Sequence, residues 1–266
     1  MEIPHRALRA AVLLLAARPL VAAGQTPLDI AALQFSPATT IAELDMGKLK
    51  GEPSRLAWSA DGRLLYLQTT ENRGRPDAKN HHYSFSVDGG RKQDLDAEPV
   101  WAADYWRGKS GQAPPDMPAL KIDLKTETRE RRTTSAPMGG DLARGGITPG
   151  EAGTSAGDAG SAAYGAQSAT VHSMVLKGQT IGEFVNSVIV PGLTFGWGPK
   201  GSQVMAFAAP KDGRIVVMDY EGRKRDVDGT GDALLPAWSQ DAQRLAWLEK
   251  GGRRKVRLRV ANVTTS

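Results

Sequence analysis

The sequence LAWSADGRLLYL, residues 56–67, returns in closely similar form as PAWSQDAQRLAWL, residues 236–248. Each copy has a short apolar segment that ends in tryptophan, a polar turn that carries an aspartate, and a second apolar run. This pattern is typical of a tight β-hairpin. Because self-similarity on this scale marks a recurring supersecondary unit, the sequence predicts a repeat architecture.

Two weaker copies lie between these stretches. A third copy contains Trp197 followed by the turn at 198–201, and a degenerate fourth copy, EPVWAADY, contains Trp101. The four tryptophans are spaced by 43, 96 and 41 residues. Because the middle spacing is close to twice the others, we expect one further unit without a tryptophan between Trp101 and Trp197.

Each visible unit also has a second half, in which a strand runs into a charged turn. These halves are predicted at residues 83–92, 120–127 and 215–224. Four short strands in roughly forty residues, with period-2 alternation, describe one blade of a β-propeller. The sequence therefore predicts an all-β propeller of about five four-stranded blades, with a range of four to six.

These units resemble the TolB-type β-propeller repeat, a bacterial relative of the Trp-Asp repeats whose core reads Pro-x-Trp-Ser-Pro-Asp-Gly. The resemblance covers most of residues 50 to 263. It implies an exported propeller that presents a rigid loop surface or an axial channel mouth to partner proteins or peptides. The residues that carry the repeat are Trp58, Asp61, Gly62, Trp101, Trp197, Gly201, Trp238 and Asp241.

The last unit, residues 235–263, shows three clear strands, around Ala237, Leu245 and Leu258. A propeller must close its ring, and the segment TIAELDM at 40–46 is suited to supply the fourth strand. We therefore expect the N-terminal segment to pair with the strand at 255–261, which would remove two unpaired sheet edges.

The first residues are organised differently. Arg6 and Arg9 precede an apolar run at 10–17, and small residues follow at 22–24, which is the layout of a secretory signal peptide. The alternative is an uncleaved N-terminal extension. The prediction is a signal peptide at 1–24, a single propeller domain at 25–266, and a periplasmic or secreted product. The absence of cysteine suits such a compartment.

Gly, Ala, Ser and Thr dominate residues 139–169, which predicts a flexible loop; a partner-binding loop is the alternative. The formal net charge of +5 is too mild to indicate nucleic-acid binding. Basic residues alternate with aliphatic ones at 255–260, which favours a solvated strand protected against edge-to-edge pairing; an anionic partner is the alternative. No stretch after the signal segment resembles a membrane span, and we expect a monomer.

Several motifs look catalytic. Residues 196–201 match G-x-G-x-x-G, but the chain runs on into a strand and not into the helix that a dinucleotide site needs, so a hairpin turn is expected. Residues 153–157 match G-x-S-x-G, with His172 as the sole downstream histidine, but lack the strand and helix of a nucleophile elbow. We therefore predict no catalytic residues, no cofactor and no enzyme activity.

Three aspartates form a candidate metal site. Asp226, Asp228 and Asp232 resemble a calcium loop, but position twelve of that loop is Ala237 and not a glutamate. An inter-blade turn is the default and a weak calcium site the alternative. Adjacent His81 and His82 would point to opposite faces of a strand, so a zinc site is not expected.

Two function classes remain. The first is a protein-interaction module of the bacterial cell envelope; the alternative is a propeller that binds or processes a saccharide or other small ligand. We expect the turns at 59–62, 198–201 and 239–242 to gather on one face, because they occupy equivalent places in their units. Asp61 and Asp241 are expected to cap their own turns; direct contact with a partner is the alternative.

Overall fold

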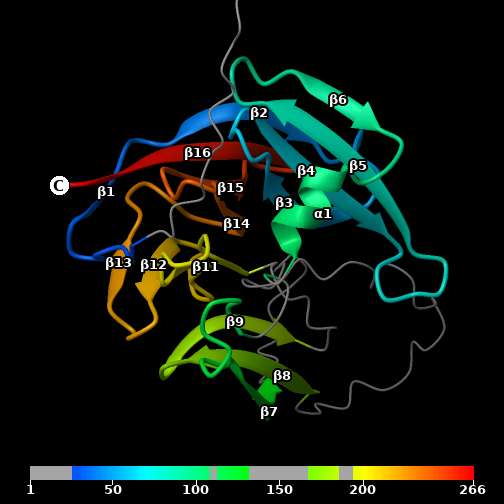
Figure 1. The fold of residues 1–266 in the computed structure, drawn as a ribbon. Coiled ribbons are helices and arrows are strands. Elements are labelled where there is room, and N and C mark those ends of the chain that lie inside the picture. The colour runs from blue at the N-terminus through cyan, green and yellow to red at the C-terminus, as the bar shows by residue number, and fades with distance from the viewer. Residues whose placement is uncertain (1–25, 108, 110–112, 132–166, 186–193) are drawn as a thin grey trace, which may run out of the picture.

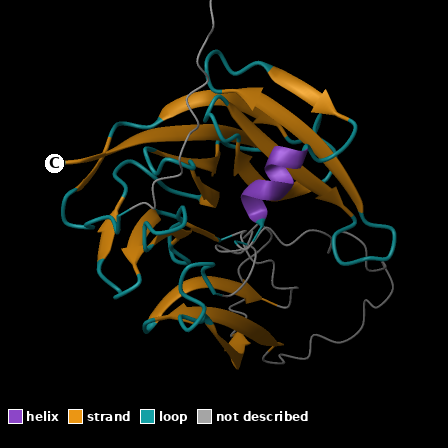
Figure 2. Ribbon diagram, viewed as in Figure 1, coloured by secondary structure: helices purple, strands orange, loops and turns teal. Residues whose placement is uncertain are grey.

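A computed structural model describes residues 26–107, 109, 113–131, 167–185 and 194–266. Within these ranges the chain forms four antiparallel sheets and one short helix (Figures 1 and 2). The chain is thus mostly β, as predicted. The proposed signal peptide and most of the proposed loop at 139–169 lie outside the described ranges, although strand β8 begins at Gln167, inside the end of that loop. In the described ranges, no helix has the length and apolar character to cross a membrane.

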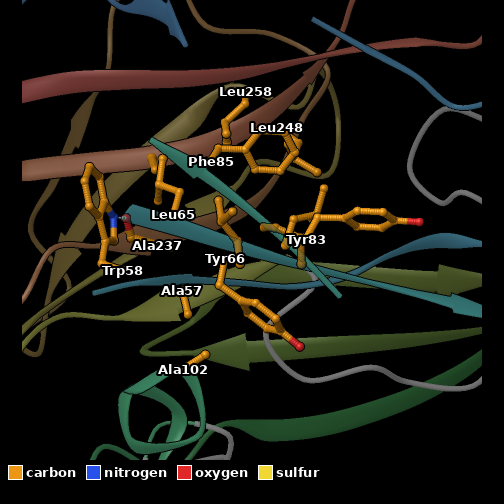
Figure 3. Close-up of a cluster of buried hydrophobic side chains, with 14 of the residues drawn as sticks. Ala57, Trp58, Leu65, Tyr66, Tyr83, Phe85, Ala102, Ala237, Leu248 and Leu258 are labelled. Atoms are coloured by element: carbon orange, nitrogen blue, oxygen red, sulfur yellow. Dashed lines mark hydrogen bonds between the residues drawn. The ribbon is translucent and has the colours of Figure 1, made fainter. Parts of the chain in front are cut away.

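The first sheet has the order β3-β4-β5-β6. Along β4, Leu65 and Leu67 alternate with Tyr66 and Gln68, so the sheet has two chemically different faces. Figure 3 shows Leu65 and its neighbour Phe85 on the apolar face, which belongs to a buried cluster. The strands are Glu52–Trp58, Leu64–Glu71, Lys79–Ser86 and Lys92–Leu95.

The second and third sheets follow in the chain. The second has the order β7-β8-β9 and lies between Trp101 and Trp197, where a unit without tryptophan is predicted. The third has the order β10-β11-β12-β13. Their strands are Asp123–Arg131, Gln167–Leu176 and Gln179–Val185 in the second sheet, and Phe195–Trp197, Val204–Ala208, Ile215–Asp219 and Lys224–Asp226 in the third.

The fourth sheet joins the two ends of the described chain. Its strand β16 pairs on one side with β15 and on the other with β2 and β1 (Figure 1). The register places Lys255 opposite Asp45 and Arg257 opposite Glu43. The predicted pairing of residues 40–46 with 255–261 is confirmed. The strands are Leu33–Phe35 (β1), Thr39–Asp45 (β2), Ala233–Trp238 (β14), Arg244–Lys250 (β15) and Lys255–Thr265 (β16).

Since β16 lies between two neighbours, it is not an edge strand, and the expectation that its basic residues guard an edge is wrong. Its basic side chains are instead used in ion pairs. Lys255 Nζ lies 2.7 Å from Glu43 Oε1, and Arg259 Nη1 lies 3.9 Å from Glu249 Oε1. The strand on its other side, β2, is far away in the sequence, which explains why the composition of β16 alone pointed to an edge.

The apolar core lies between the sheets. One cluster joins the β3–β6 sheet to the fourth sheet, a second joins the fourth sheet to the third, and a third cluster joins the third sheet to the second. Among the described residues, no apolar cluster joins the second sheet directly to the first. The sheet order fits a propeller, while the blade number of about five and the closure of the ring stay predictions.

The degenerate copy at Trp101 was expected to be a hairpin, and this is wrong. Residues Val100–Trp106 form helix α1, which contacts β3. After Trp58 and Trp238 comes a Ser-x-Asp turn, and after Trp197 a Gly-Pro-Lys-Gly turn, but Ala102 and Ala103 follow Trp101, and alanine is the strongest helix former. Pro99 precedes the helix with an extended backbone, a position where the absence of an N–H costs nothing. The helix therefore takes the chain position of a strand.

Candidate functional site

The three strong repeat tryptophans are buried in the core between sheets. Trp58 and Trp238 are 0% exposed and Trp197 is 1% exposed. The indole Nε1 of Trp58 donates a hydrogen bond to the carbonyl of Ala237 at 2.9 Å, which ties the first sheet to the fourth. Trp101 is only partly buried, in keeping with its place on α1. These side chains support the loops and do not themselves present a surface.

The turns that follow Trp58 and Trp238 have the same hydrogen-bond network. Ser59 Oγ donates to Asp61 Oδ1 at 2.6 Å, and Arg63 N donates to the same oxygen at 3.0 Å. Ser239 Oγ donates to Asp241 Oδ1 at 2.5 Å, and the amide of the residue two positions after the aspartate donates at 3.0 Å. Each aspartate thus closes its own turn, as expected from such short polar side chains.

This network also sets the electrostatics of the turn. The Ser59 hydroxyl, followed by the Arg63 amide, holds the pKa of Asp61 below its ordinary value, because both hydrogen bonds favour the charged carboxylate. Gly62 and its counterpart Ala242 both have a positive φ, of 67° and 59°. The first turn has glycine at this left-handed position, where glycine is unstrained, and the second turn has alanine in the same region, where an L side chain is strained.

Arg244 joins the two turns to each other. Its guanidinium carbon lies 4.8 Å from the centroid of the Trp58 ring, a distance suited to a cation–π contact. A Cβ added at Gly62 would lie 1.8 Å from Arg244 Nη2, so the guanidinium fills the space that a side chain at Gly62 would occupy. The backbone N–H of Arg244 donates to Ser239 Oγ in its own turn. The turns at 59–62 and 239–242 therefore lie side by side.

The third turn, at 198–201, has no aspartate of its own, and Asp116 from a distant segment takes that role. Asp116 Oδ2 accepts a hydrogen bond from Gly201 N at 2.8 Å, and its other oxygen accepts one from the Tyr220 hydroxyl at 3.2 Å. The G-x-G-x-x-G motif is a hairpin turn between β10 and β11, as predicted. Gly198 N donates to the carbonyl of Val204 across this hairpin.

Strand directions relate the third turn to the other two. Gly196 on β10 lies against the carbonyl of Pro236 on β14, since a Cβ there would be 2.2 Å from that oxygen. At the far end of β11, in the turn between β11 and β12, the Gly213 carbonyl accepts a hydrogen bond from Ala233 N, at the start of β14. The chain thus passes from the Gly213 end toward the turn at 198–201 along β10, and from Ala233 toward the turn after Trp238 along β14. The two strands run in the same direction, so the third turn lies at the same end of the strands as the turn after Trp238.

The remaining motifs have structural partners or fall outside the described ranges. Asp226 Oδ2 lies 2.6 Å from Arg214 Nη1, and in the described part of the chain no three histidine or acidic side chains form a group that could hold a metal. His82 and His81 point to opposite faces of β5, toward Tyr66 and Glu71. His172 Nδ1 lies 3.1 Å from the Thr126 hydroxyl, while the G-x-S-x-G stretch at 153–157 is outside the described residues.

Sequence reasoning missed one polar cluster. On the face of the first sheet opposite Leu65, the Tyr66 hydroxyl lies 2.6 Å from His82 Nδ1 and 3.3 Å from Gln68 Oε1. We name Arg55, Tyr66, Gln68, His82, Glu98 and Trp101 the Tyr66 cluster. The available signal was in β4, where a tyrosine and a glutamine alternate with leucines in a strand that is buried along most of its length.

Comparisons with known proteins find similar solved structures but no matching family. No family model matches the sequence, and no curated protein matches it. Among solved structures, the chain is similar to TolB from Acinetobacter baumannii at 11% identity, over 81% of this chain and 44% of that chain, with a TM-score of 0.22. An uncomplexed acylaminoacyl peptidase from Pyrococcus horikoshii matches at 12% identity (76% and 36% covered, TM-score 0.20), and Sqt1 from Chaetomium thermophilum at 14% (79% and 43%, TM-score 0.19).

The chain thus spans less than half the length of each of these structures. At such TM-scores the likenesses carry no argument about architecture or activity.

Proposed function

We propose that this chain is an exported β-propeller of the TolB type that acts by binding a protein or peptide partner in the bacterial cell envelope, without catalysis. The observation that carries the proposal is the pair of adjoining turns at 59–62 and 239–242. Both are closed by their own Ser and Asp side chains and both stand on fully buried tryptophans. A surface held this firmly loses little conformational entropy when a partner binds.

The turn face, defined here as the exposed residues of these two turns and of the positions directly after them, has a mixed polar character. Arg63 and Gln243 are exposed, and their hydrogen bonds within the turns come from the backbone N–H. Their side chains are therefore open to a partner, whereas the aspartates are occupied in holding the turns. Exposed, mixed polar residues on a rigid frame are typical of the positions through which a scaffold recognises its partners.

Three further segments of the chain have a role in this proposal. The signal peptide at 1–24 would export the protein, β2 would close the ring by completing the last blade, and the segment at 139–169 would add contacts to the partner. The pairing of β2 with β16 supports the second of these points. The product would be a monomeric periplasmic or secreted protein without cofactor.

The test is capture of partners from envelope extract by the immobilised full chain, with proteins identified by mass spectrometry. Arg63→Glu should weaken capture of the bound partner at least tenfold. Lys211→Glu is the matched control, because it makes the same charge change at an exposed position beside Gly213, at the opposite end of the strands. Equal capture by both variants would rule out the turn face as the binding surface.

Deletion of residues 145–165 tests the contribution of the segment outside the described ranges. Weaker capture with unchanged far-UV circular dichroism and melting temperature is the expected result. If the deletion unfolds the domain, the segment belongs to a blade, and its binding role is wrong.

A further inference from the structure

The Tyr66 cluster lies on the face of the first sheet that turns away from the fourth sheet. Cross-strand partners share a face, and the register puts Arg55 opposite Gln68 and Gln68 opposite His82. Figure 3 shows the Tyr66 ring on the other side of the sheet from Leu65, on the side where Ala102 of α1 lies. Helix α1 packs on this face near Ala57 and Tyr66, and Arg55, Gln68 and His82 lie on the same face.

The base of the cluster is buried and polar. Tyr66 is 0% exposed and Gln68 6% exposed. The Tyr66 hydroxyl has one proton for two neighbours, and the shorter distance, to His82 Nδ1, favours donation to the imidazole. His82 is then protonated on Nε2, which makes no hydrogen bond to a described residue. A donor is thereby fixed in orientation at the rim of the cluster.

The rim adds an acceptor, a cation and an aromatic ring. Arg55 Nη1 and Glu98 Oε1 are 3.7 Å apart, too far for a hydrogen bond, and this Glu98 oxygen is buried without a hydrogen-bond partner. Trp101 meets Tyr66 edge to face, with ring centroids 6.1 Å apart, and is itself half-buried. The side chains of Arg55 and Glu98 remain 42% and 26% exposed, so a ligand can reach their exposed atoms, while Glu98 Oε1 itself is covered.

The charges of the cluster cancel. Arg55 and Glu98 contribute one charge each, and burial lowers the pKa of His82, so the imidazole is neutral near pH 7. A site with no net charge gains nothing from an ionic ligand that it would have to desolvate. It suits a neutral molecule that both donates and accepts hydrogen bonds and that has an apolar face to lay on an indole.

We propose that the Tyr66 cluster binds an uncharged saccharide. A pyranose ring meets each requirement: its hydroxyls bind Arg55, the exposed part of the Glu98 carboxylate and His82 Nε2, and its C–H face packs on Trp101. This site lies on a different surface from the turn face and does not depend on the partner binding proposed above.

The experiment is isothermal titration of the full chain with neutral sugars, namely glucose, galactose, mannose and N-acetylglucosamine and their dimers, beside glucuronate and glucosamine as charged counterparts. At least one neutral sugar should bind, with its charged counterparts at least tenfold weaker. Trp101→Ala and His82→Ala should each weaken binding at least tenfold. His81→Ala is the matched control on the opposite face of β5 and should leave binding unchanged.

Tyr66→Phe keeps the aromatic ring and removes the hydroxyl that orients His82, so it should weaken binding while the circular dichroism spectrum stays that of the folded parent. The proposal is overturned if no neutral sugar binds, if a charged counterpart binds best, or if affinity survives both Trp101→Ala and His82→Ala. Trp101→Phe is a further check on the indole. If it binds the sugar as weakly as Trp101→Ala while its fold stays intact, the sugar packs on the indole ring of Trp101.

Discussion

The segments at Trp238 and at Trp101 both begin with Pro-x-Trp, but they fold differently. Trp238 is followed by a Ser-Gln-Asp-Ala turn whose side chains close the hairpin, and the tryptophan is fully buried. Trp101 is followed by two alanines, forms helix α1 and is only partly buried. A tryptophan at the repeat position is therefore not sufficient for a blade strand. The residues after it decide between hairpin and helix: Ser-Gln-Asp-Ala after Trp238 closes a turn, whereas Ala102 and Ala103 after Trp101 favour a helix.

Replacing each of these two tryptophans by alanine should give the largest difference in the free energy of unfolding. Trp238→Ala should lower the free energy of unfolding by about 3–5 kcal/mol, because it leaves a large cavity between the third and fourth sheets. Trp101→Ala should cost clearly less, since part of that side chain already meets solvent. Urea unfolding followed by circular dichroism measures both. Equal losses would mean that the two positions are equivalent after all.

Removing the turn aspartate should have the next largest effect. Asp61→Ala deletes the acceptor for Ser59 Oγ and Arg63 N and should lower stability by about 1–2 kcal/mol. Asp104→Ala on α1 is the control, because its carboxylate makes an exposed ion pair with Arg107. Such pairs contribute about 0.5 kcal/mol or less. A loss in the control as large as in Asp61→Ala would contradict the turn-closing role.

Glycine substitutions sharpen the contrast between helix and turn. Ala103→Gly, at an exposed position inside α1, should lower stability by about 1 kcal/mol, because glycine is the poorer helix former. Ala60→Gly, at the exposed tip of the first turn, should cost at most about half of that. If chemical denaturation ranks the two variants in the reverse order, the segment after Trp101 is not helical in solution.

The acidity of Asp61 gives the smallest effect, with a defined sign. Its pKa is held below the ordinary aspartate value near 3.8, so the charged turn adds stability above that pH and loses it as pH falls through the lower, folded-state pKa. The stability difference between the parent and Asp61→Asn should therefore be largest near pH 6 and shrink below pH 4. Melting curves across this range check it, and a difference that grows on acidification would contradict the assignment.

Local sequence patterns predicted the hairpins after Trp58 and Trp238 well because each of these turns contains its own hydrogen-bonding side chains. The pairing of β2 with β16 could also be predicted from the sequence, because the last unit lacked a strand and the ring had to be completed. The hairpin at 198–201 was predicted too, but not the aspartate that holds its turn, because Asp116 is far away in the chain. The Tyr66 cluster was missed for a related reason: Glu98 and Trp101 reach it only once α1 has folded against β3.

The sharing of one sheet by the two chain ends is the feature on which the whole architecture depends. The chain has no cysteine, so the double variant Glu43→Cys and Arg257→Cys introduces a single possible disulfide between directly opposed residues of β2 and β16. Opposed residues of antiparallel strands lie about 4.5–5.5 Å apart at Cα, within the range that a disulfide spans.

Mild oxidation followed by mass spectrometry under non-reducing conditions should find the 43–257 cross-link in nearly all molecules. The pair Glu43→Cys and Lys211→Cys, placed on different sheets, should stay reduced. An uncross-linked first pair, or equal cross-linking of both pairs, would mean that β2 does not complete the C-terminal sheet.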